Sequence, residues 1–419
     1  MKIREVRLTP IAFPDPPLLN AAGIHQPWAL RTIVEVDCGD GLVGLGETYG
    51  DAPHLELMRK VAPHLLGHDP FHTSALLQVV QALLGSSDAP DRHGLTGVSS
   101  PEKTALRVFS PIEVACLDLQ GQAIGRPVHD LLGGAVRDSV PFSAYLFYKY
   151  AAHPGGEPDP YGDGLTPEQM VGQARQLIDR YGFRSIKLKG GVFPPDEELD
   201  AIRALREAFP EHPLRIDPNA AWSVETSQRI AREAEGLLEY LEDPTAGRQG
   251  MAEVAKVASM PLATNMCVVA FEHLPEAIEL GSVQVILSDH HYWGGLRNSA
   301  RLAGICQTWG IGLSMHSNSH LGISLAAMTH LGAALPELSY AADTHTPWQL
   351  GVDVLEEPLR FVDGAVPVPT GPGLGVTLDR DALARMHEDF LRCGITERDD
   401  TTYMQQHFDP TFSHARPRW

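Results

Sequence analysis

Short apolar runs alternate with helical patterns through the second half of this chain, and each run ends in a residue that can bind a metal or move a proton. Intervals of 23 to 28 residues separate these run ends, which are Lys189, Asp217, Glu242, Asn265, Asp289, His316 and Asp343. One strand, one helix and two short loops occupy about that length. The repeat therefore predicts parallel strands joined by helical crossovers.

Seven strands and the helices between them follow from this repeat. The predicted strands are 185–189, 214–217, 238–242, 262–265, 283–289, 311–316 and 338–343, and helical patterns occupy, for instance, 196–209, 225–235, 296–309 and 321–335. One helix start is explicit, because Thr166 suits an N-cap, Pro167 suits the first turn and Gln169 completes a capping box.

A barrel and a doubly wound sheet both accommodate such units. In a barrel the carboxyl ends of all strands converge on one face, where enzymes of this fold build their active sites. A lone Asp or Asn after a strand is usually a turn former or a helix cap, and a lone His is more often structural. Separate caps have no reason to recur with the period of the fold, so a barrel with one shared site is favoured.

The first part of the chain has the pattern of an α+β unit. The predicted strands are 3–11, 30–36 and 42–47, and the predicted helices are 54–66 and 113–124. Gly39-Asp40-Gly41 indicates a hairpin turn. The segments 14–28 and 85–103 are predicted to be surface loops, and a loop as long as the first is usually functional or mobile.

The chain of 419 residues has 53 acidic and 33 basic residues, a formal net charge of −20. This balance disfavours nucleic acid and acidic membrane surfaces as partners. The N-terminus lacks the apolar region of a signal peptide, and no apolar stretch approaches the roughly 18 residues of a spanning helix. A cytoplasmic protein is predicted, because the cysteines are odd in number and far apart: Cys38, Cys116, Cys267, Cys306 and Cys393.

Three hard oxygen donors end three consecutive predicted strands, namely Asp217, Glu242 and Asn265. They suit Mg²⁺, which prefers octahedral oxygen coordination. Zinc is disfavoured because no cysteine is placed to help and the histidines do not fall together on these strands. A magnesium site is therefore predicted.

Two lysines precede the three oxygen donors. Lys187 and Lys189 lie two residues apart, so on a strand both side chains point to the same face. A lysine close to a second ammonium group and to a metal gives up its proton more easily, which would let Lys189 act as a base.

Seven short motifs follow one another at the ends of the predicted strands: Lys187-Leu188-Lys189-Gly190-Gly191, Asp217-Pro218-Asn219, Leu241-Glu242-Asp243-Pro244, Ala263-Thr264-Asn265-Met266, Ser288-Asp289-His290-His291-Tyr292-Trp293, His316-Ser317-Asn318 and Asp343-Thr344-His345. In this order they resemble the active-site motifs of the glucarate dehydratases, a branch of the enolase superfamily. The similarity covers nearly the whole chain and includes Leu18-Leu19-Asn20-Ala21-Ala22-Gly23-Ile24-His25, Tyr145-Leu146-Phe147-Tyr148 and Arg398-Asp399-Asp400.

The resemblance implies an α/β fold, a modified (β/α)7β TIM barrel with an N-terminal α+β capping domain that the C-terminal segment completes. The predicted division assigns 1–135 to the capping domain, 136–365 to the barrel with the active site, and 366–419 to the C-terminal segment that returns to the cap.

The resemblance also implies roles for individual residues. The implied metal ligands are Asp217, Glu242 and Asn265, and the implied catalytic residues are Lys189, His316, Asp289, Lys187, Asn318 and Asp343. Lys189 and His316, the latter held by Asp289, would face one carbon from opposite sides. The residues implied in substrate binding are His25, Asn20, Tyr145, Asn219, Ser317, His345 and Arg398. Arg398 would clamp the distal carboxylate, so that an acidic protein can bind a dianion.

The implied reaction removes water from D-glucarate, and from L-idarate, to give 5-dehydro-4-deoxy-D-glucarate through a Mg²⁺-stabilised enediolate. The expected partner is a small acid sugar, and the protein is expected to form a homo-oligomer. One alternative is a dehydratase of another aldarate or aldonate such as galactarate, because 86–103, with Ser99 as the nearest candidate contact, gives no clear match to the family's second lid. Another is an acid-sugar epimerase or racemase that uses Lys189 and His316 as bases.

Overall fold

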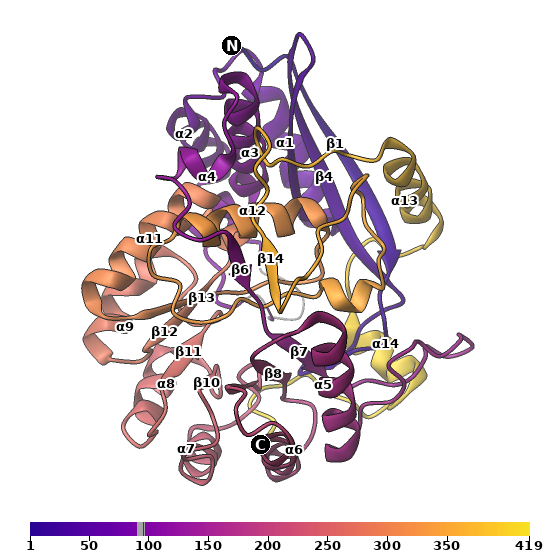
Figure 1. Cartoon of the computed structure of the whole chain (residues 1–419), viewed down its shortest axis with the longest axis vertical. Coiled ribbons are helices and arrows are strands. Elements are labelled where there is room, and N and C mark those ends of the chain that lie inside the picture. The colour runs from indigo at the N-terminus through magenta and orange to yellow at the C-terminus, as the bar shows by residue number, and fades with distance from the viewer. Residues whose placement is uncertain (90–94, 96) are drawn as a thin grey trace.

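A curled sheet of seven parallel strands forms the centre of the molecule (Figure 1). The computed structural model describes residues 1–89, 95 and 97–419. Neighbours in the sheet follow chain order: β7 (Ala144–Phe147), β8 (Ile186–Lys189), β9 (Leu214–Asp217), β10 (Tyr240–Glu242), β11 (Leu262–Thr264), β12 (Val285–Ser288) and β13 (Gly312–Met315). All strands run the same way, so their carboxyl ends lie at one edge. The predicted barrel architecture is confirmed.

An extended segment before Asp343 closes the sheet between β13 and β7. Its residue Ala342 forms a parallel bridge with Phe142, and the Asp343 N–H donates to the Met315 carbonyl at 2.8 Å. The prediction of one continuous strand over 338–343 is wrong. Its partner Phe142 donates to the Gly364 carbonyl instead, at 2.9 Å, so only part of the ladder can form.

Strand β7 is a real strand that the sequence pattern did not single out. Its four residues are all buried. A short apolar run that is buried on both faces shows no alternation, so periodicity alone cannot identify it as a strand.

Helices cover the outside of the sheet (Figure 1). They are α5 (Pro167–Tyr181), α6 (Pro195–Ala208), α7 (Val224–Glu233), α8 (Gly247–Ala255), α9 (Leu274–Leu280), α11 (Leu296–Trp309) and α12 (Gly322–Ala334), with the short elements η2 (Phe271–His273), α10 (His290–Trp293) and η3 (Thr346–Gln349) at the loops. The capping box at Thr166 is confirmed. Helix α12 is buried along its whole length because it packs against the N-terminal strands as well as the barrel.

The N-terminal unit is an antiparallel sheet backed by helices. Its strands are β1 (Glu5–Pro14), β4 (Trp28–Gly39) and β5 (Leu42–Tyr49), with the small hairpin β2 (Leu19–Asn20) and β3 (Gly23–Ile24) inside the predicted first loop. Its helices are α1 (Ala52–Val61), η1 (Ala62–Leu65), α2 (Thr73–Leu84), α3 (Pro101–Ile124) and α4 (Val128–Leu131). This unit has an apolar core of its own, from Ile3 to Leu119.

Helix α3 begins earlier than the sequence predicts. Ser100 caps it, accepting a hydrogen bond from the Lys103 N–H, and the helix continues through Pro111. The predicted loop 85–103 is therefore wrong at its end, because glycine, serine and proline residues hid the first half of the helix. Residues 90–94 and 96 of that loop lie outside the described part of the chain.

The C-terminal residues contact both halves of the molecule. Strand β14 (Ala365–Pro367) pairs with β6 (Ser139–Pro141), α13 (Arg380–Arg392) packs against β1, and α14 (Asp400–His407) packs against β3. At the very end, the Arg418 N–H donates to the Ala221 carbonyl at 2.7 Å. The division into 1–135, 136–365 and 366–419 stays a prediction.

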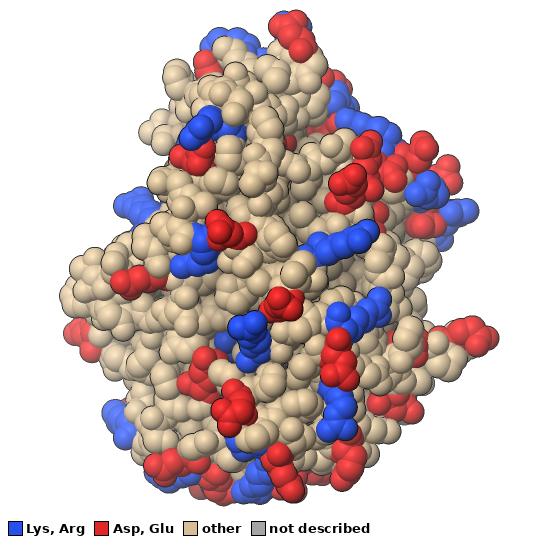
Figure 2. All heavy atoms as spheres, in the orientation of Figure 1, with Lys and Arg blue, Asp and Glu red and all other residues tan. Residues whose placement is uncertain are grey.

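Charged side chains of both signs are interspersed over the face shown in Figure 2. No basic area on this face would attract an anion. In the described ranges, no helix combines the length and the apolar character needed to cross a bilayer.

We expect the contact between α3 and β5 to depend on glycine. A Cβ atom added at Gly46 would overlap the Pro111 carbonyl oxygen, so Gly46→Ala should lower the free energy of unfolding by about 3 kcal/mol through overpacking. Gly172→Ala is the matched control, because Gly172 lies within α5 with open space around it, and the change should stabilise the helix by about 0.5–1 kcal/mol. Chemical denaturation measures the free energy of unfolding of both variants. Equal changes in the two variants would contradict the packing argument.

Candidate active site

Three oxygen-bearing side chains lie at the carboxyl edge of the barrel. Asp217 and Glu242 end β9 and β10, and Asn265 directly follows β11. Their relative exposures are 0%, 0% and 1%. The sheet order places these three strands side by side, so the predicted ligands come from adjacent positions.

Several buried atoms in this group lack hydrogen-bond partners in the described structure. They include Glu242 Oε1 and both amide atoms of Asn265. Burying polar atoms without partners costs free energy, and such atoms often mark an ion site. Carboxylate and amide oxygens are the donors that Mg²⁺ prefers. The residues therefore fit a magnesium ion.

Lys187 lies among three carboxylates. Its Nζ is 2.5 Å from Asp343 Oδ2, 2.6 Å from Glu242 Oε2 and 3.9 Å from Asp217 Oδ2. The ammonium group also lies 4.8 Å from the centre of the Tyr145 ring. Burial by itself would lower the pKa of Lys187, but the carboxylates of Asp343 and Glu242 outweigh it and hold that pKa well above its usual value. Lys187 is therefore a permanent cation here.

Lys189 points into the same group, as the two-residue spacing predicts. Its Nζ is 2.6 Å from Asp217 Oδ2. Burial would raise the pKa of Asp217, but the charges of Lys189 and Lys187 hold it below its usual value. Burial instead raises the pKa of Glu242 well above its usual range, since the nearby Asp217 and Asp343 carboxylates add to burial and Lys187 offsets only part.

The loops behind the ligands hold backbone conformations with positive φ. The φ angles are 50° at Asn219, 58° at Ala220 and 34° at Asp243. Such strain clusters at functional sites, where surrounding structure enforces it. The Asn219 Nδ2 donates to Asp217 Oδ1 at 3.2 Å, and Asp243 Oδ2 accepts from the Asn265 N–H at 2.8 Å. Asp243 thus orients Asn265, a role that its place beside Glu242 in the sequence did not reveal.

A histidine–aspartate pair lies beyond the oxygen donors. His316 Nδ1 is 3.1 Å from Asp289 Oδ2, and both side chains are buried. Burial would raise the pKa of Asp289, but the neighbouring rings of His291 and His316, both hydrogen-bonded to its carboxylate, hold it well below its usual range. Burial lowers the pKa of His316, and Asp289 opposes this only in part. The carboxylate can only accept, so neutral His316 carries its proton on Nδ1 and its lone pair on Nε2.

Asp289, His290 and His291 bring potential ligand atoms within 4.8 Å of one another. Asp289 Oδ1 accepts hydrogen bonds from the His291 N–H at 2.9 Å and from His291 Nδ1 at 2.8 Å, while Oδ2 faces His316. Both oxygens are committed to hydrogen bonds. We therefore assign this cluster as part of the His316 environment and not as a second metal site.

Four further predicted residues gather near His316. Asn318 Nδ2 donates to the hydroxyl groups of Tyr49 and Tyr292, both at 2.9 Å. Ser317 Oγ and His345 Nδ1 are buried atoms without partners in the described structure. The ring of His345 also packs edge-on against the ring of Tyr145, at 5.3 Å.

The predicted contacts from the chain ends are already paired. Asn20 Nδ2 donates to Asp400 Oδ2 at 2.8 Å, and Arg398 donates to the same carboxylate from Nε at 2.9 Å. His25 Nδ1 lies 2.9 Å from Asp15 Oδ2, and its ring stacks on His345 with centroids 6.3 Å apart. A substrate carboxylate at Arg398 would have to share the guanidinium with Asp400.

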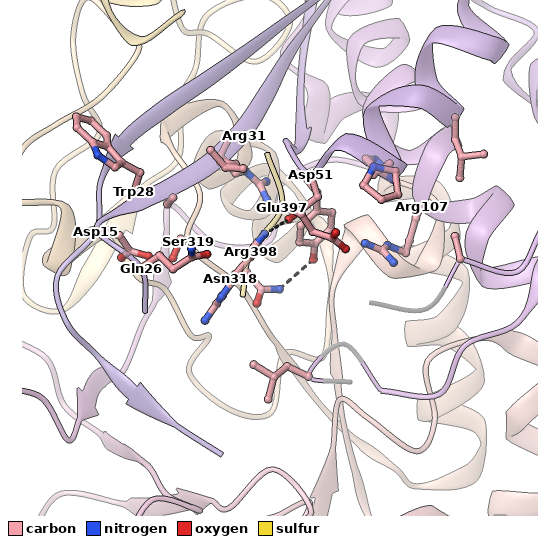
Figure 3. Close-up of a pocket in the computed structure, with 18 of the residues that line it drawn as sticks. Asp15, Gln26, Trp28, Arg31, Asp51, Arg107, Asn318, Ser319, Glu397 and Arg398 are labelled. Carbon is pink, nitrogen blue, oxygen red and sulfur yellow. Dashed lines mark hydrogen bonds between the residues drawn. The ribbon is translucent and has the colours of Figure 1, made fainter. Parts of the chain in front are cut away.

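A cavity of about 110 Å³ lies between the N-terminal sheet and the barrel (Figure 3). Its walls include Arg31 and Tyr49 from the sheet, Arg107 from α3, Asn318 from the loop after β13, and Arg398. Two predicted site residues, Asn318 and Arg398, lie in this wall. The cavity therefore lies beside the group formed by Asp217, Glu242 and Asn265 and does not enclose it.

The sequence of this chain matches two protein-family models and known proteins. The family described as Enolase C-terminal domain-like matches residues 169–382, and the Mandelate racemase / muconate lactonizing enzyme N-terminal domain matches residues 4–133. A protein of Streptomyces coelicolor named "Probable glucarate dehydratase" is 53% identical over 428 residues, which cover 100% of this chain and 99% of the relative.

Solved structures agree over the full length. An enolase from Thermobispora bispora, complexed with magnesium and formate, has a TM-score of 0.98 and 64% identity, with 100% of both chains covered. An enolase from Pseudomonas fluorescens, with bound magnesium, potassium and tartrate, has a TM-score of 0.96 and 50% identity, covering 100% of this chain and 99% of that one.

The buried Glu242 carboxylate, crowded by Asp217 and Asp343, should make the metal-free protein less stable than a neutral variant. Folded Glu242 binds its proton more tightly than unfolded Glu242 does, so its stabilising contribution is complete below the ordinary pKa of a glutamate and is lost as pH rises through the raised value. In chelator, the Tm of Glu242→Gln should therefore exceed that of the wild type, by a margin that grows with pH.

The same variant tests the ion site. Saturating Mg²⁺ should raise the wild-type Tm by about 5 °C and leave Glu242→Gln unchanged. Glu239→Gln is the control: Glu239 precedes the same strand but pairs with Arg215, at 2.7 Å, and this variant should keep the Mg²⁺ response. If Mg²⁺ raised the Tm of Glu242→Gln as much as that of the wild type, the assignment of Glu242 as a metal ligand would be contradicted.

Proposed function

The chain belongs to the enolase superfamily, and from that membership we propose that it is a Mg²⁺-dependent carbon–oxygen lyase that dehydrates D-glucarate, and L-idarate, to 5-dehydro-4-deoxy-D-glucarate. One observation carries the proposal: Lys189 and the Asp289–His316 pair lie on either side of the strands that bear Asp217, Glu242 and Asn265. The full-length similarity to a probable glucarate dehydratase supports the choice of substrate.

The chemical difficulty is removal of a proton beside a carboxylate, because the resulting enediolate carries two negative charges. Bound Mg²⁺ supplies Lewis-acid stabilisation of that charge. Asp217, Glu242 and Asn265 would hold the ion. Lys187, which stays cationic among its carboxylate neighbours, would neutralise part of the charge on the reacting carboxylate.

His316 would act as the base on D-glucarate. Its Nε2 lone pair would take the proton, and Asp289 would stabilise the imidazolium that forms. The same proton would then pass to the hydroxyl group on the next carbon, which leaves as water. The carbon–oxygen bond breaks, a carbon–carbon double bond forms, and the resulting enol converts to the keto product.

Lys189 would serve the opposite epimer. It lies on β8, while His316 follows β13 near the other end of the sheet, so the two bases approach a bound carbon from different sides. The Lys189 Nζ lies 2.6 Å from Asp217 Oδ2, one of the residues that would hold the ion.

The substrate would be enclosed by groups from both halves of the molecule. Asn219, Ser317 and His345 would donate or accept hydrogen bonds, since each has a buried polar atom without a partner in the described structure. Asn318 and Asp343 would support His316 and Lys187, and Asn20, His25, Tyr145 and Arg398 would close the site. Self-association stays a prediction.

A Mg²⁺-dependent assay for keto product tests the proposal. D-Glucarate should be turned over at least about tenfold faster, in kcat/KM, than galactarate, whose hydroxyl groups differ in configuration, and than any aldonate, which lacks the second carboxylate that Arg398 would bind. Faster turnover of galactarate or of an aldonate would assign the same machinery to another acid sugar. Solvent deuterium uptake without keto product would instead indicate an epimerase or racemase.

Separate variants distinguish the two bases. His316→Asn should reduce dehydration of D-glucarate by at least about 10³-fold, while deuterium exchange of the opposite epimer through Lys189 should partly survive. Lys189→Met should instead keep dehydration of D-glucarate and lose deuterium exchange of the opposite epimer. The control is His387→Asn, since His387 lies on α13, which packs against β1, and its Nδ1 lies 2.6 Å from the Pro10 carbonyl oxygen. Normal dehydration by His316→Asn would show that the base is misassigned.

A further inference from the structure

A line of buried hydrogen bonds runs from the N-terminal sheet to the base pair. Arg31 of β4 places a terminal nitrogen 3.0 Å from His291 Nε2. His291 Nδ1 lies 2.8 Å from Asp289 Oδ1, and Asp289 Oδ2 lies 3.1 Å from His316 Nδ1. All four side chains are at least nine-tenths buried. Figure 3 shows Arg31 on the N-terminal sheet, among the residues that line the cavity.

The chemistry of Arg31 fixes the protons along this line. A guanidinium can only donate, so His291 Nε2 must accept. The proton of His291 then lies on Nδ1, where it is donated to Asp289. A proton on both nitrogens of His291 would point a donor at Arg31. His291 is therefore held as a neutral ring with one tautomer.

The neutral state of His291 decides how much charge Asp289 offers to His316. A carboxylate that faces one neutral ring and one base can use its full charge to stabilise the imidazolium of His316. If His291 also became cationic, two positive rings would share one carboxylate and repel each other. His316 would then be a weaker base.

We infer that Arg31 is a positioning residue for the base: it keeps His291 neutral and so reserves the negative charge of Asp289 for His316. This inference rests on the proposed function of His316. It makes the N-terminal unit a contributor to proton transfer in the barrel, through the contact of Arg31 with His291.

A second set of contacts holds Arg31 in place. Its Nε donates to Glu47 Oε1 at 2.9 Å. Glu47 of β5 also accepts from the N–H groups of Leu321 and Ser324 at the start of α12, at 2.8 and 2.9 Å. Arg31 can reach His291 only while the sheet is seated on α12. The geometry thus couples that seating to the strength of the base.

Charged and titratable groups from every neighbouring element surround the line. They are His290 and Tyr292 on α10, Glu47 and Tyr49 on β5, His54 on α1, Arg107 on α3, His320 before α12, and Lys187 and Lys189 on β8. Arg31 is the cation in contact with His291 Nε2, and Ser324 Oγ, at 3.1 Å, is the second neighbour of that nitrogen. A hydroxyl group can donate or accept, so Ser324 does not fix the tautomer.

A double-mutant cycle tests the inference. Arg31→Gln should lower kcat by about 10- to 100-fold, because His291 can then take a second proton and weaken His316 as a base. The pH at which activity rises should move to a lower value. In a His291→Asn background, where no charge can form at 291, the same change should cost less than about threefold. Arg31→Lys should rescue part of the loss. Arg7→Gln, which removes an ion-paired arginine on β1, should leave activity unchanged.

Histidine NMR supplies a readout that does not depend on turnover. In ¹⁵N-histidine-labelled protein, Arg31→Gln should replace the single His291 tautomer of the wild type with other protonation states and shift the titration of His316 to lower pH. Unchanged His291 and His316 signals in folded Arg31→Gln, or equal losses of activity in both backgrounds, would overturn the inference. Failure of wild-type protein to dehydrate any acid sugar would instead reject the proposed function and leave the NMR result valid.

Discussion

Five charged side chains share one small buried volume at the carboxyl edge of the barrel, and the rest of the site depends on how their charges are balanced. They are Lys187, Lys189, Asp217, Glu242 and Asp343. Charges removed from water need close partners. The two ammonium groups pair with Asp217, Asp343 and one oxygen of Glu242, but Glu242 keeps its proton more tightly than usual. In the described part of the chain, Glu242 Oε1 and the Asn265 amide have no hydrogen-bond partner. The barrel frame prevents these groups from moving apart, so the arrangement fits the cation that we propose.

The N-terminal unit contributes more than a cover over this edge. Glu47 caps the first turn of α12, and Arg31 contacts His291 beside the Asp289–His316 pair. Tyr49 from the same sheet accepts a hydrogen bond from Asn318. The surroundings of His316 are therefore an interface between two units, whereas Lys187, Lys189, Asp217 and Glu242 all lie on barrel strands. The lysines and oxygen donors accordingly come from the ends of barrel strands, and the groups that support His316 come from both units.

Much of the fold could be predicted because its signals are local. The strand–helix repeat gave the barrel, and the capping box at Thr166 gave one exact helix start. Three features escaped. Strand β7 is buried on both faces and shows no alternation, the segment before Asp343 pairs only in part, and α3 continues through Pro111. Each depends on what packs against the segment, which its own residues do not encode.

The candidate site divides in the same way. The sequence by itself determined which residue types stand at the strand ends, because the two-residue period of a strand and the repeat of the barrel place Lys189, Asp217 and Glu242 at one edge. Only the tertiary structure decided that Asn20 donates to Asp400 and that Arg31 meets His291. The partners in these two contacts lie 380 and 260 positions apart along the chain. Short-range backbone periodicity fixes where a side chain points, but a buried hydrogen bond forms with whichever distant group the packing brings within reach.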